Sequence, residues 1–290
     1  MDSSSSFRLA HLSDLHFSKV DKDFKQFFSK RWIGNLNFLL RRKKDFDYTI
    51  LNSMPSLLQK EKVQLVLLSG DLTCTSSDFE FRMASEFTQK LQAAGLEVAV
   101  IPGNHDHYTK ESYRKKTFYE FFSSAQGSHP WNLKKDRLSL KQLSKEWWLI
   151  LLDTTLATPL LCSHGNFSSD LEKSLEEALK SIPPNSHVII ANHFPIDRKK
   201  WRPALQRKEA FLNLLKRHPE VKCYLHGHDH QSNIIDLREQ GLPIAVDSGS
   251  STHSKSGSWS LLECKPNSCS FTPFLWKNEW EPQTPKQFTW

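Results

Sequence analysis

The side chains best suited to chemistry in this sequence are carboxylates, imidazoles and amides that follow short apolar runs. Their oxygen and nitrogen atoms are the ligands that hard and borderline divalent cations prefer. In chain order the candidates are Asp14, His16, Asp71, Asn104, His105, Asp106, His193, His226, His228 and His230. These are more donors than one ion can use, and an aspartate can bridge two cations about 3.5 to 4 Å apart. The set therefore predicts a two-metal centre that supports in-line displacement at phosphorus.

The apolar runs that precede these side chains have the length and the Val, Ile and Leu content of buried strands. They read FRLAHLSDLH, VQLVLLSGDLT, LEVAVIPGNHD, WWLILLDTT, HVIIANHFP, CYLHGHDH and LPIAVDSGS. Helical patterns lie between some of them, with apolar faces formed by Phe46, Ile50, Met54, Leu57 and Leu58, by Phe79, Met83, Phe87 and Leu91, and by Leu171, Leu175, Ala178 and Leu179. This alternation predicts an α/β fold whose ligands gather at the carboxyl ends of the strands. The later run SWSLLECKPNSCSFTPFLW is typical of two antiparallel strands around a Pro-Asn turn.

Length and composition fit one globular domain over residues 1–290, with 38% hydrophobic and 24% charged residues. No run reaches the roughly 18 to 20 apolar residues of a membrane-spanning helix, and the start MDSSSSFRLAHL lacks the basic region and cleavage site of a signal peptide. The five scattered cysteines fit reduced thiols better than a disulfide framework or a zinc ribbon. We therefore expect a cytoplasmic protein.

Five motifs occur in one order: DLH from Asp14, SGD ending at Asp71, GNHD around Asn104, NHFP containing His193, and GHDH ending at His230. On these motifs the sequence resembles the calcineurin-like metallophosphoesterases from about Phe7 to about Ser250. The resemblance implies a sandwich of two mixed β-sheets flanked by helices, with the metal site at the loop edge.

The same resemblance implies a role for each motif residue. Three side chains would bind the first metal (Asp14, His16 and His230), three would bind the second (Asn104, His193 and His228), and Asp71 would bridge the two. His105 would be the general acid or transition-state stabiliser, and Asp106 would orient its ring. His226 has no role in the family pattern, so a structural role and a contact with substrate or ligands both stay open. Nitrogen and oxygen ligands without thiolates favour Mn²⁺ over Zn²⁺ or Cu²⁺, so the predicted cofactor is two divalent cations, Mn²⁺ by preference.

The positive charge of the chain is concentrated in one stretch. From Lys22 to Lys44 eight basic residues face one acidic residue, a net +7, which equals the net charge of the whole chain. Bulky apolar residues share this stretch, as in an interfacial helix that meets anionic head groups, although a helix at the core edge is the alternative. The predicted lipid or membrane contacts are Phe24, Phe27, Phe28, Trp32, Leu36, Phe38, Leu39, Leu40, Arg41, Arg42, Lys43 and Lys44.

We interpret this stretch, about residues 22–45, as an aromatic and basic lid insertion above the metal site. A second insertion of the same character, about residues 108–125, contains SYRKKTFYEFF, and KKWR follows His193. Together the three segments favour an amphiphilic substrate with an anionic head.

Within the superfamily these features resemble the UDP-2,3-diacylglucosamine pyrophosphatases of lipid A biosynthesis, above all their chlamydial branch. The widespread bacterial form has Arg at the position of His105. The resemblance implies hydrolysis of the UDP-linked glycolipid to UMP and 2,3-diacylglucosamine 1-phosphate, at an anionic membrane surface on the cytoplasmic face of the inner membrane. The alternatives are a soluble cyclic-nucleotide or general phosphodiesterase, a nuclease, and a metal-free scaffold that has lost its ligands. We expect no nucleic-acid partner, and the sequence indicates no protein partner.

Overall fold

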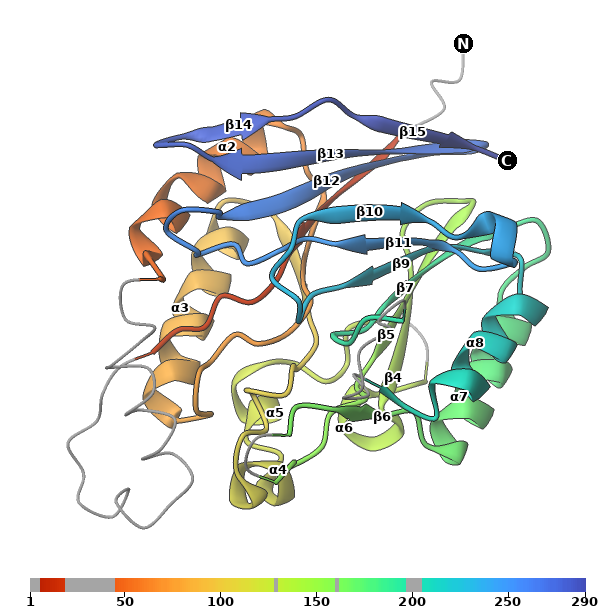
Figure 1. Ribbon diagram of the computed structural model, residues 1–290, viewed down its shortest axis with the longest axis horizontal. Helices are drawn as coiled ribbons and strands as arrows, with labels where there is room; N and C mark the ends of the chain where they lie inside the picture. Colours follow the sequence, from red (N-terminus) through yellow and green to blue (C-terminus); the bar gives the residue numbers. More distant parts are fainter. Residues whose placement is uncertain (1–5, 19–44, 128–129, 160–161, 197–204) are drawn as a thin grey trace.

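The computed structural model describes residues 6–18, 45–127, 130–159, 162–196 and 205–290, and their strands form two facing sheets (Figure 1). The first sheet has the order β14-β13-β12-β1-β2-β3, and β15 pairs with β13 beside this path. The strands β1, β2 and β3 run parallel, and β12 joins β1 in the antiparallel direction. The bounds are β1 (Phe7–Leu12), β2 (Leu65–Leu68), β3 (Glu97–Val100), β12 (Ser258–Lys265), β13 (Ser268–Trp276), β14 (Trp280–Pro282) and β15 (Lys286–Thr289).

The second sheet has six strands in the order β10-β11-β9-β7-β5-β4. Its four central strands are parallel, and β10 and β4 pair antiparallel at the two edges. The bounds are β4 (Leu138–Gln142), β5 (Trp147–Leu152), β7 (His187–Ala191), β9 (Val221–His226), β10 (Asn233–Asp236) and β11 (Ile244–Asp247). A separate pair is formed by β6 (Gly165–Asn166) and β8 (Leu205–Gln206).

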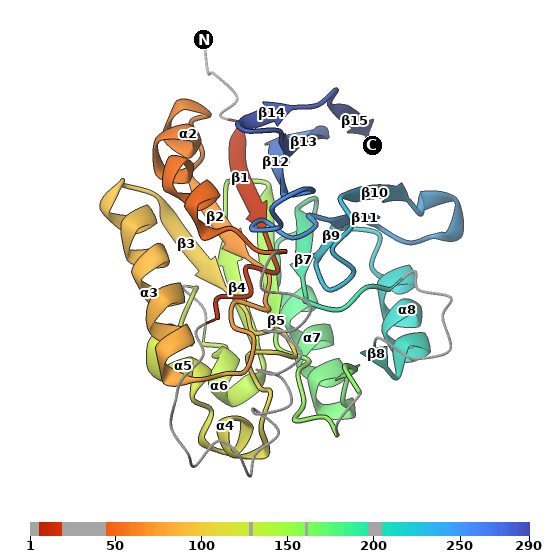
Figure 2. The same ribbon diagram turned by 60° about the vertical axis from the view of Figure 1, so that its left-hand side comes forward.

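Helices cover both outer faces of the sandwich, so the molecule has four layers (Figure 2). On the first sheet lie α2 (Met54–Lys60) and α3 (Asp78–Ala93), and on the second lie α7 (Ser169–Ser181) and α8 (Lys208–Arg217). The short elements are η3 (Tyr48–Ser53), α4 (Lys110–Lys115), α5 (Phe118–Phe121), α6 (Leu133–Asp136) and η4 (Arg238–Gln240). Among the described residues, no helix has both the length and the apolar character needed to cross a bilayer.

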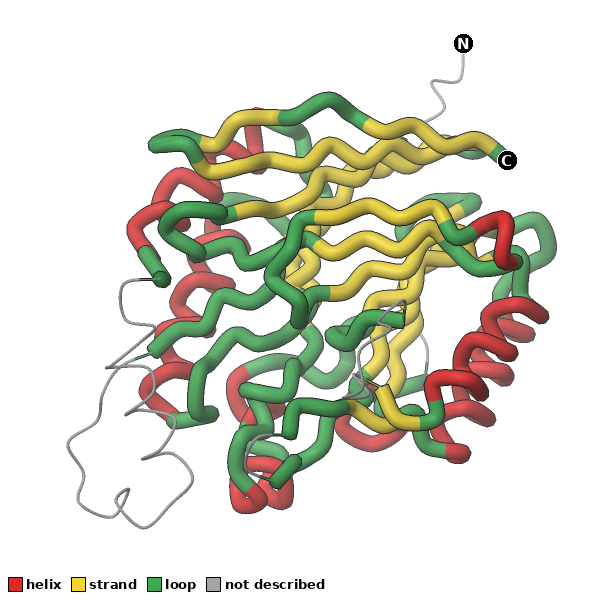
Figure 3. The backbone as a smooth tube through the Cα atoms, in the orientation of Figure 1, coloured by secondary structure: helices red, strands yellow, loops and turns green. Residues whose placement is uncertain are grey.

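The central strands are buried on both faces, because one face meets the opposite sheet and the other meets helices. In β2, Leu65 and Leu67 lie in the core between the sheets, whereas Val66 and Leu68 pack toward the helices. Side chains of a strand alternate between faces, so both sets must be apolar here. This explains the continuous apolar runs of the sequence, and Figure 3 shows the two stacked sheets between the helices that they bury against.

Seven predicted strands are confirmed as β1, β2, β3, β5, β7, β9 and β11. The predicted hairpin is β12 and β13, which pair from Ser258 with Leu275 to Lys265 with Ser268. The helical face of Leu171, Leu175, Ala178 and Leu179 is also confirmed, since all four are buried in α7. The α/β sandwich of two mixed sheets flanked by helices is therefore the observed fold.

The apolar face predicted for α3 is partly wrong. Phe79 is 38% exposed, and Phe81 is buried instead, with Ala84, Phe87 and Leu91 on the same side. Steps of four residues drift by roughly 40° each around a helix of 3.6 residues per turn, so Phe79 and Leu91 do not share a face. Phe46 also departs from its predicted helix: it lies before η3 and forms an isolated bridge with His253.

The second predicted insertion, residues 108–125, places some of its aromatic side chains in the core. Phe118 and Phe122 are buried, and the ring of Phe121 stacks on Phe81 at a centroid distance of 5.3 Å. The basic residues of α4 stay exposed. These three rings therefore pack against α3, and the amphiphilic substrate expected from the segment stays a prediction. The predicted lipid contacts from Phe24 to Lys44, and the segment KKWR, lie outside the described residues.

Candidate metal centre

The predicted metal ligands come together from five strand ends in both sheets. Asp14 and His16 follow β1, Asp71 follows β2, and Asn104 follows β3 in the first sheet. From the second sheet, His193 follows β7, and His228 and His230 follow β9. Asp14, His16 and His193 are fully buried, so these three side chains lie beneath the protein surface.

Three side chains form the first group of donors, as the motif resemblance implies. Asp14, His16 and His230 offer one ligand atom each, and these atoms all lie within 4.8 Å of one another. His16 Nε2 lies 3.0 Å from His230 Nε2 and 3.6 Å from Asp14 Oδ1. His230 Nε2 lies 3.1 Å from the same carboxylate oxygen. The three donors therefore face a common point.

The second group consists of Asp71, His193 and His228, with Asn104 beside them. His228 Nδ1 lies 2.9 Å from Asn104 Oδ1 and 3.3 Å from His193 Nε2. His193 Nε2 in turn lies 3.4 Å from Asp71 Oδ2. An amide oxygen, a carboxylate and two imidazole nitrogens thus converge on a second point.

Asp71 lies between the two groups. Its Oδ2 atom is 3.9 Å from His16 Nε2 in the first group and 3.4 Å from His193 Nε2 in the second. Its other oxygen, Oδ1, accepts a hydrogen bond of 2.7 Å from the backbone N–H of His105. This position is the one that a bridging carboxylate occupies in a two-metal site.

The backbone of the centre is held in an unusual conformation. Five of the predicted ligands have left-handed φ angles: Asp14 at 54°, His16 at 47°, Asp71 at 52°, His228 at 76° and His230 at 55°. Each such non-glycine residue costs roughly 1 to 2 kcal/mol, so the surrounding structure must stabilise it. Hydrogen bonds from Asp14 N to Gly70 O (3.0 Å) and from His16 N to Asp71 O (2.9 Å) do so.

Glycines allow the ligand loops to approach one another closely. A Cβ atom on Gly103 would lie 2.2 Å from Asp71 Oδ1, and one on Gly227 would lie 2.3 Å from Asp14 Oδ2. Both distances are far below van der Waals contact. The glycines of the GNHD and GHDH motifs are therefore needed to seat the two carboxylates.

Backbone carbonyls orient two of the imidazole rings. His193 Nδ1 donates to Ser69 O at 2.9 Å, so Nε2 is the ring nitrogen that faces Asp71. His105 Nδ1 donates to Cys74 O at 2.7 Å, and a ring nitrogen of His105 lies within 4.8 Å of donor atoms of His16 and Asp71. Sequence motifs cannot reveal these acceptors, because every residue carries a carbonyl.

Asp106 does not orient the ring of His105, contrary to the prediction. Its buried carboxylate accepts hydrogen bonds from the backbone N–H groups of Leu72, Thr73 and Gly103, at 2.9 to 3.1 Å. The Thr73 hydroxyl also donates to Asp106 and lies 3.2 Å from the carbonyl of His105. Asp106 thus ties the loop after β2 to the loop after β3 through its hydrogen bonds to backbone N–H groups and the Thr73 hydroxyl.

The charges of the centre are those of a cation site. Burial raises the pKa of Asp71, but the charges of His193 and His105 outweigh burial and hold that pKa below its usual range. Burial lowers the pKa of His16 to about 3, so its imidazole is neutral and has a free lone pair. Burial also lowers the pKa of His193, but Asp71 opposes it and brings that pKa to about 10. The two buried carboxylates thus favour positive charge beside His193, which a bound cation would supply in place of a proton.

These residues fit two divalent cations. Oxygen and imidazole donors that face shared points, with no thiolate among them, suit hard and borderline metals. Neighbouring imidazole nitrogens 3.0 to 3.3 Å apart are placed as they would be around a common ion. The choice of Mn²⁺ stays a prediction.

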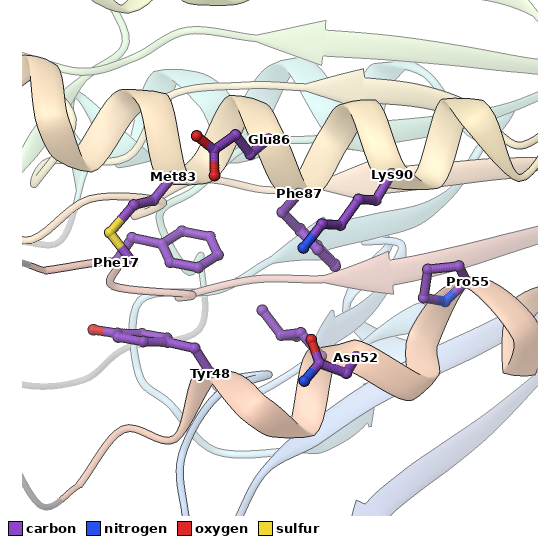
Figure 4. Close-up of a pocket in the computed structure, with 9 residues that line it drawn as sticks. Phe17, Tyr48, Asn52, Pro55, Met83, Glu86, Phe87 and Lys90 are labelled. Atoms are coloured by element: carbon purple, nitrogen blue, oxygen red, sulfur yellow. The ribbon is translucent and has the colours of Figure 1, made fainter.

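Several residues that contact the centre lie outside the five sequence motifs, so the sequence did not identify them. The ring of Phe46 lies 5.1 Å from the ring of His16, and the Tyr48 hydroxyl donates to His16 O at 2.8 Å. Tyr48 and Phe17 also line a cavity of about 340 Å³ between η3, α2 and α3 (Figure 4), which no metal ligand lines. His226, for which the sequence left two roles open, is buried at the end of β9, with its ring 5.7 Å from Tyr224.

Comparisons with known proteins agree with this geometry. The family model described as calcineurin-like phosphoesterase matches residues 7–232. The chain is 25% identical over 182 residues to the 3',5'-cyclic adenosine monophosphate phosphodiesterase CpdA of Vibrio vulnificus, covering 62% of this chain and 58% of that protein. It is 25% identical over 183 residues to a 3',5'-cyclic-nucleotide phosphodiesterase of Nostoc sp., covering 59% of this chain and 58% of that protein.

The matches thus span less than two thirds of the length of these two relatives. Among solved structures, a dimetal phosphatase from Danio rerio has the same fold, with a TM-score of 0.67, 16% identity and 98% of each chain covered. The family model covers most of the chain and includes all seven predicted metal ligands. The chain therefore belongs to the calcineurin-like phosphoesterase family.

Proposed function

We propose that this chain is a dinuclear metal phosphodiesterase that acts on small, water-soluble phosphodiesters such as cyclic nucleotides. The observation that carries the proposal is the position of Asp71 between two groups of nitrogen and oxygen donors. The two bacterial relatives are named as cyclic-nucleotide phosphodiesterases, which supports the substrate class. The metal-free scaffold is disfavoured, because every ligand position is filled and the side chains converge.

Two divalent cations, when bound, would supply an activated water and Lewis-acid stabilisation of phosphoryl charge. The protein holds their ligands rigidly: His193 is fixed by the carbonyl of Ser69, and Asp71 by the N–H of His105. His105 keeps its Nδ1 proton on the Cys74 carbonyl, so Nε2 is the ring atom that gains or gives a proton during turnover. A general acid in this position contributes roughly 10² to 10⁴ in rate.

The test is hydrolysis of bis(p-nitrophenyl) phosphate and 3',5'-cyclic AMP by metal-loaded protein, with and without a chelator. Asp71→Asn should lower kcat/KM by about 10³-fold, since it removes several kcal/mol of metal-dependent stabilisation. Asp78→Asn is the matched control, because Asp78 is an exposed acid in the first turn of α3. Activity that survives both chelation and Asp71→Asn would refute the proposal.

A second candidate is hydrolysis of UDP-2,3-diacylglucosamine at an anionic membrane surface. The observation that favours it is the net +7 stretch from Lys22 to Lys44, which mixes basic and bulky apolar residues directly after the ligands Asp14 and His16. Each Lys or Arg near an anionic surface contributes about 1 kcal/mol of attraction. Attraction to an anionic membrane would help the enzyme reach a lipid-linked substrate, whereas a free nucleotide does not require it.

Deletion of residues 22–44 separates the two candidates. If the substrate is water-soluble, the deletion spares turnover of cyclic AMP, and neither form sediments with phosphatidylglycerol vesicles. If the substrate is the glycolipid, the full chain hydrolyses UDP-2,3-diacylglucosamine in detergent and binds vesicles in low salt, and the deletion abolishes both. Failure of the metal-loaded full chain to cleave that lipid would eliminate the second candidate.

A further inference from the structure

A small cationic cavity lies apart from the predicted metal ligands, where α4 and α6 meet the end of β5. Figures 1 and 2 both place α4, α5 and α6 together at one end of the sandwich. The cavity has a volume of about 190 Å³, and four of its lining residues are basic: Arg114, Lys116, Lys134 and Arg137. Among the described residues one acidic side chain, Asp153, shares the lining, so these side chains carry a surplus of three positive charges.

The carboxylate of Asp153 is engaged in hydrogen bonds within the protein. Oδ1 accepts from the N–H and the hydroxyl of Thr155, at 2.9 and 2.5 Å, and lies 3.5 Å from Arg137 Nη2. Oδ2 accepts from the Tyr119 hydroxyl at 2.8 Å. Asp153 thus fixes Arg137 and Tyr119 at the wall, and its charge is compensated within the protein.

Two of the basic side chains have no hydrogen-bond or ion-pair partner in the described part of the chain. Arg114 in α4 and Lys134 in α6 are exposed, and neither side chain forms a hydrogen bond or ion pair with the part of the chain that the structure describes. Lys116, in contrast, donates to the backbone carbonyl of Lys134. Arg114 and Lys134 are therefore two cations that line one cavity with no acidic partner in the described structure.

A buried polar atom in the same wall also lacks a partner. His107 is 1% exposed and lines the cavity, and its Nδ1 atom has no hydrogen-bond partner among the described residues. Its ring is held edge-on against Tyr113, another lining residue, at a centroid distance of 5.5 Å. A buried nitrogen without a partner is costly unless a ligand or water completes it.

We propose that this cavity is a binding subsite for a phosphate oxyanion, held by Arg114, Lys134 and Arg137, with His107 in its lining. Sites that enclose a whole small molecule measure about 300 to 1,000 Å³, so 190 Å³ suits a single anionic group. Arginine and lysine together supply the charge-assisted hydrogen bonds that bind phosphate oxygens.

The subsite is connected to the metal centre through the loops that form both. His107 follows Asp106 in the loop that also holds Asn104. On the other side, Thr154 directly follows Asp153 and donates to Asn192 Oδ1 at 2.7 Å, and that oxygen accepts the N–H of His193 at 2.9 Å. The phosphate is therefore either a second phosphoryl group of the substrate or free phosphate that acts beside the centre.

The test is calorimetric titration of inorganic phosphate into metal-loaded protein. Arg114→Ala with Lys134→Ala should remove one class of phosphate sites, or weaken it at least about tenfold, since two charge-assisted contacts are lost. The matched control is Lys110→Ala with Lys135→Ala, which removes the same charge from α4 and α6 at exposed residues outside the cavity lining. The two double variants should have the same thermal stability.

Equal phosphate binding by the wild type and the cavity variant overturns the proposal, and so does equal weakening in both double variants. This titration does not require turnover, so its failure is distinct from failure of the proposed phosphodiesterase activity.

Two kinetic experiments, which rest on that activity, identify the source of the phosphate. A substrate phosphate predicts a higher KM in the cavity variant for a dinucleotide that carries a 5'-phosphate, but not for bis(p-nitrophenyl) phosphate. Free phosphate predicts that added phosphate changes kcat in the wild type and not in the cavity variant.

Discussion

His16 Nε2 and His230 Nε2 lie 3.0 Å apart, although 214 residues separate them in the chain. Both ring nitrogens face the carboxylate of Asp14, which lies 3.1 Å from the nearer of them. A bound cation would hold the ends of β1 and β9 together, and these strands belong to opposite sheets. The metal centre is thus also a link between the two halves of the sandwich.

Metal removal should therefore destabilise the fold. Metal at 100 times its Kd stabilises the native state by about 2.7 kcal/mol, so chelation should lower Tm and Mn²⁺ should restore it. His230→Ala should shrink this metal-dependent shift, whereas His164→Ala, at a histidine with no hydrogen bond among the described residues, should preserve it. Differential scanning calorimetry measures the shift, and an equal shift in the two variants would contradict the role of His230.

His105→Ala should impair turnover without emptying the metal site. The side chain lies next to Asp71, but its Nδ1 is committed to the Cys74 carbonyl, and the contact with Asp71 is made by the backbone N–H. We expect a loss of about 10² to 10⁴ in kcat, the contribution of a general acid. Metal content by plasma emission spectroscopy should stay at two ions per chain. Loss of one ion would instead identify His105 as a ligand.

Gly103→Ala should lower metal affinity through a direct clash. The new Cβ would lie 2.2 Å from Asp71 Oδ1, so the bridging carboxylate must shift. Gly95→Ala is a useful contrast, because Gly95 has a φ of 80° but no heavy atom within 4 Å of the added Cβ. That variant should lose roughly 1 to 2 kcal/mol of stability from its backbone and keep its metal affinity. Metal titration followed by chemical denaturation would separate the two effects.

Glu80 should make stability depend on pH. Burial raises the pKa of Glu80 to about 7, although backbone N–H groups of Thr75 and Ser77 and the Thr75 hydroxyl donate to it. Because the folded-state pKa lies above the ordinary glutamate value of 4.5, the native state binds more protons than the unfolded state between these two pH values. Its contribution is fully present below pH 4.5 and is lost as pH rises through 7.

The measurement is the free energy of unfolding of the wild type and of Glu80→Gln from pH 4 to 8. Their difference should change in favour of the variant as pH rises, with a slope of at most about 1.4 kcal/mol per pH unit for one proton. A difference that does not vary with pH would show that Glu80 has an ordinary pKa in the folded protein.

Local sequence determined the architecture to the extent that it depends on periodicity and residue type. Continuous apolar runs such as LVLL in β2 identify strands buried on two faces, because both sets of alternating side chains must then be apolar. Parallel strands bring their carboxyl ends to one edge, so the residues after these strands could be expected to meet. The convergence of Asp14, Asp71, His193 and His230 follows that expectation.

Only the tertiary structure determined which atoms form hydrogen bonds with these side chains and orient them. The carbonyls of Ser69 and Cys74 orient His193 and His105, and carbonyls have no sequence signal. Asp106 accepts three backbone N–H groups instead of holding a ring, since the loops after β2 and β3 meet at its carboxylate. Phe81 lies in the core where Phe79 was predicted, and Arg114 and Lys134 line the same cavity. Each outcome depends on segments distant in sequence that meet in the fold, and residue type and spacing carry no information on those distances.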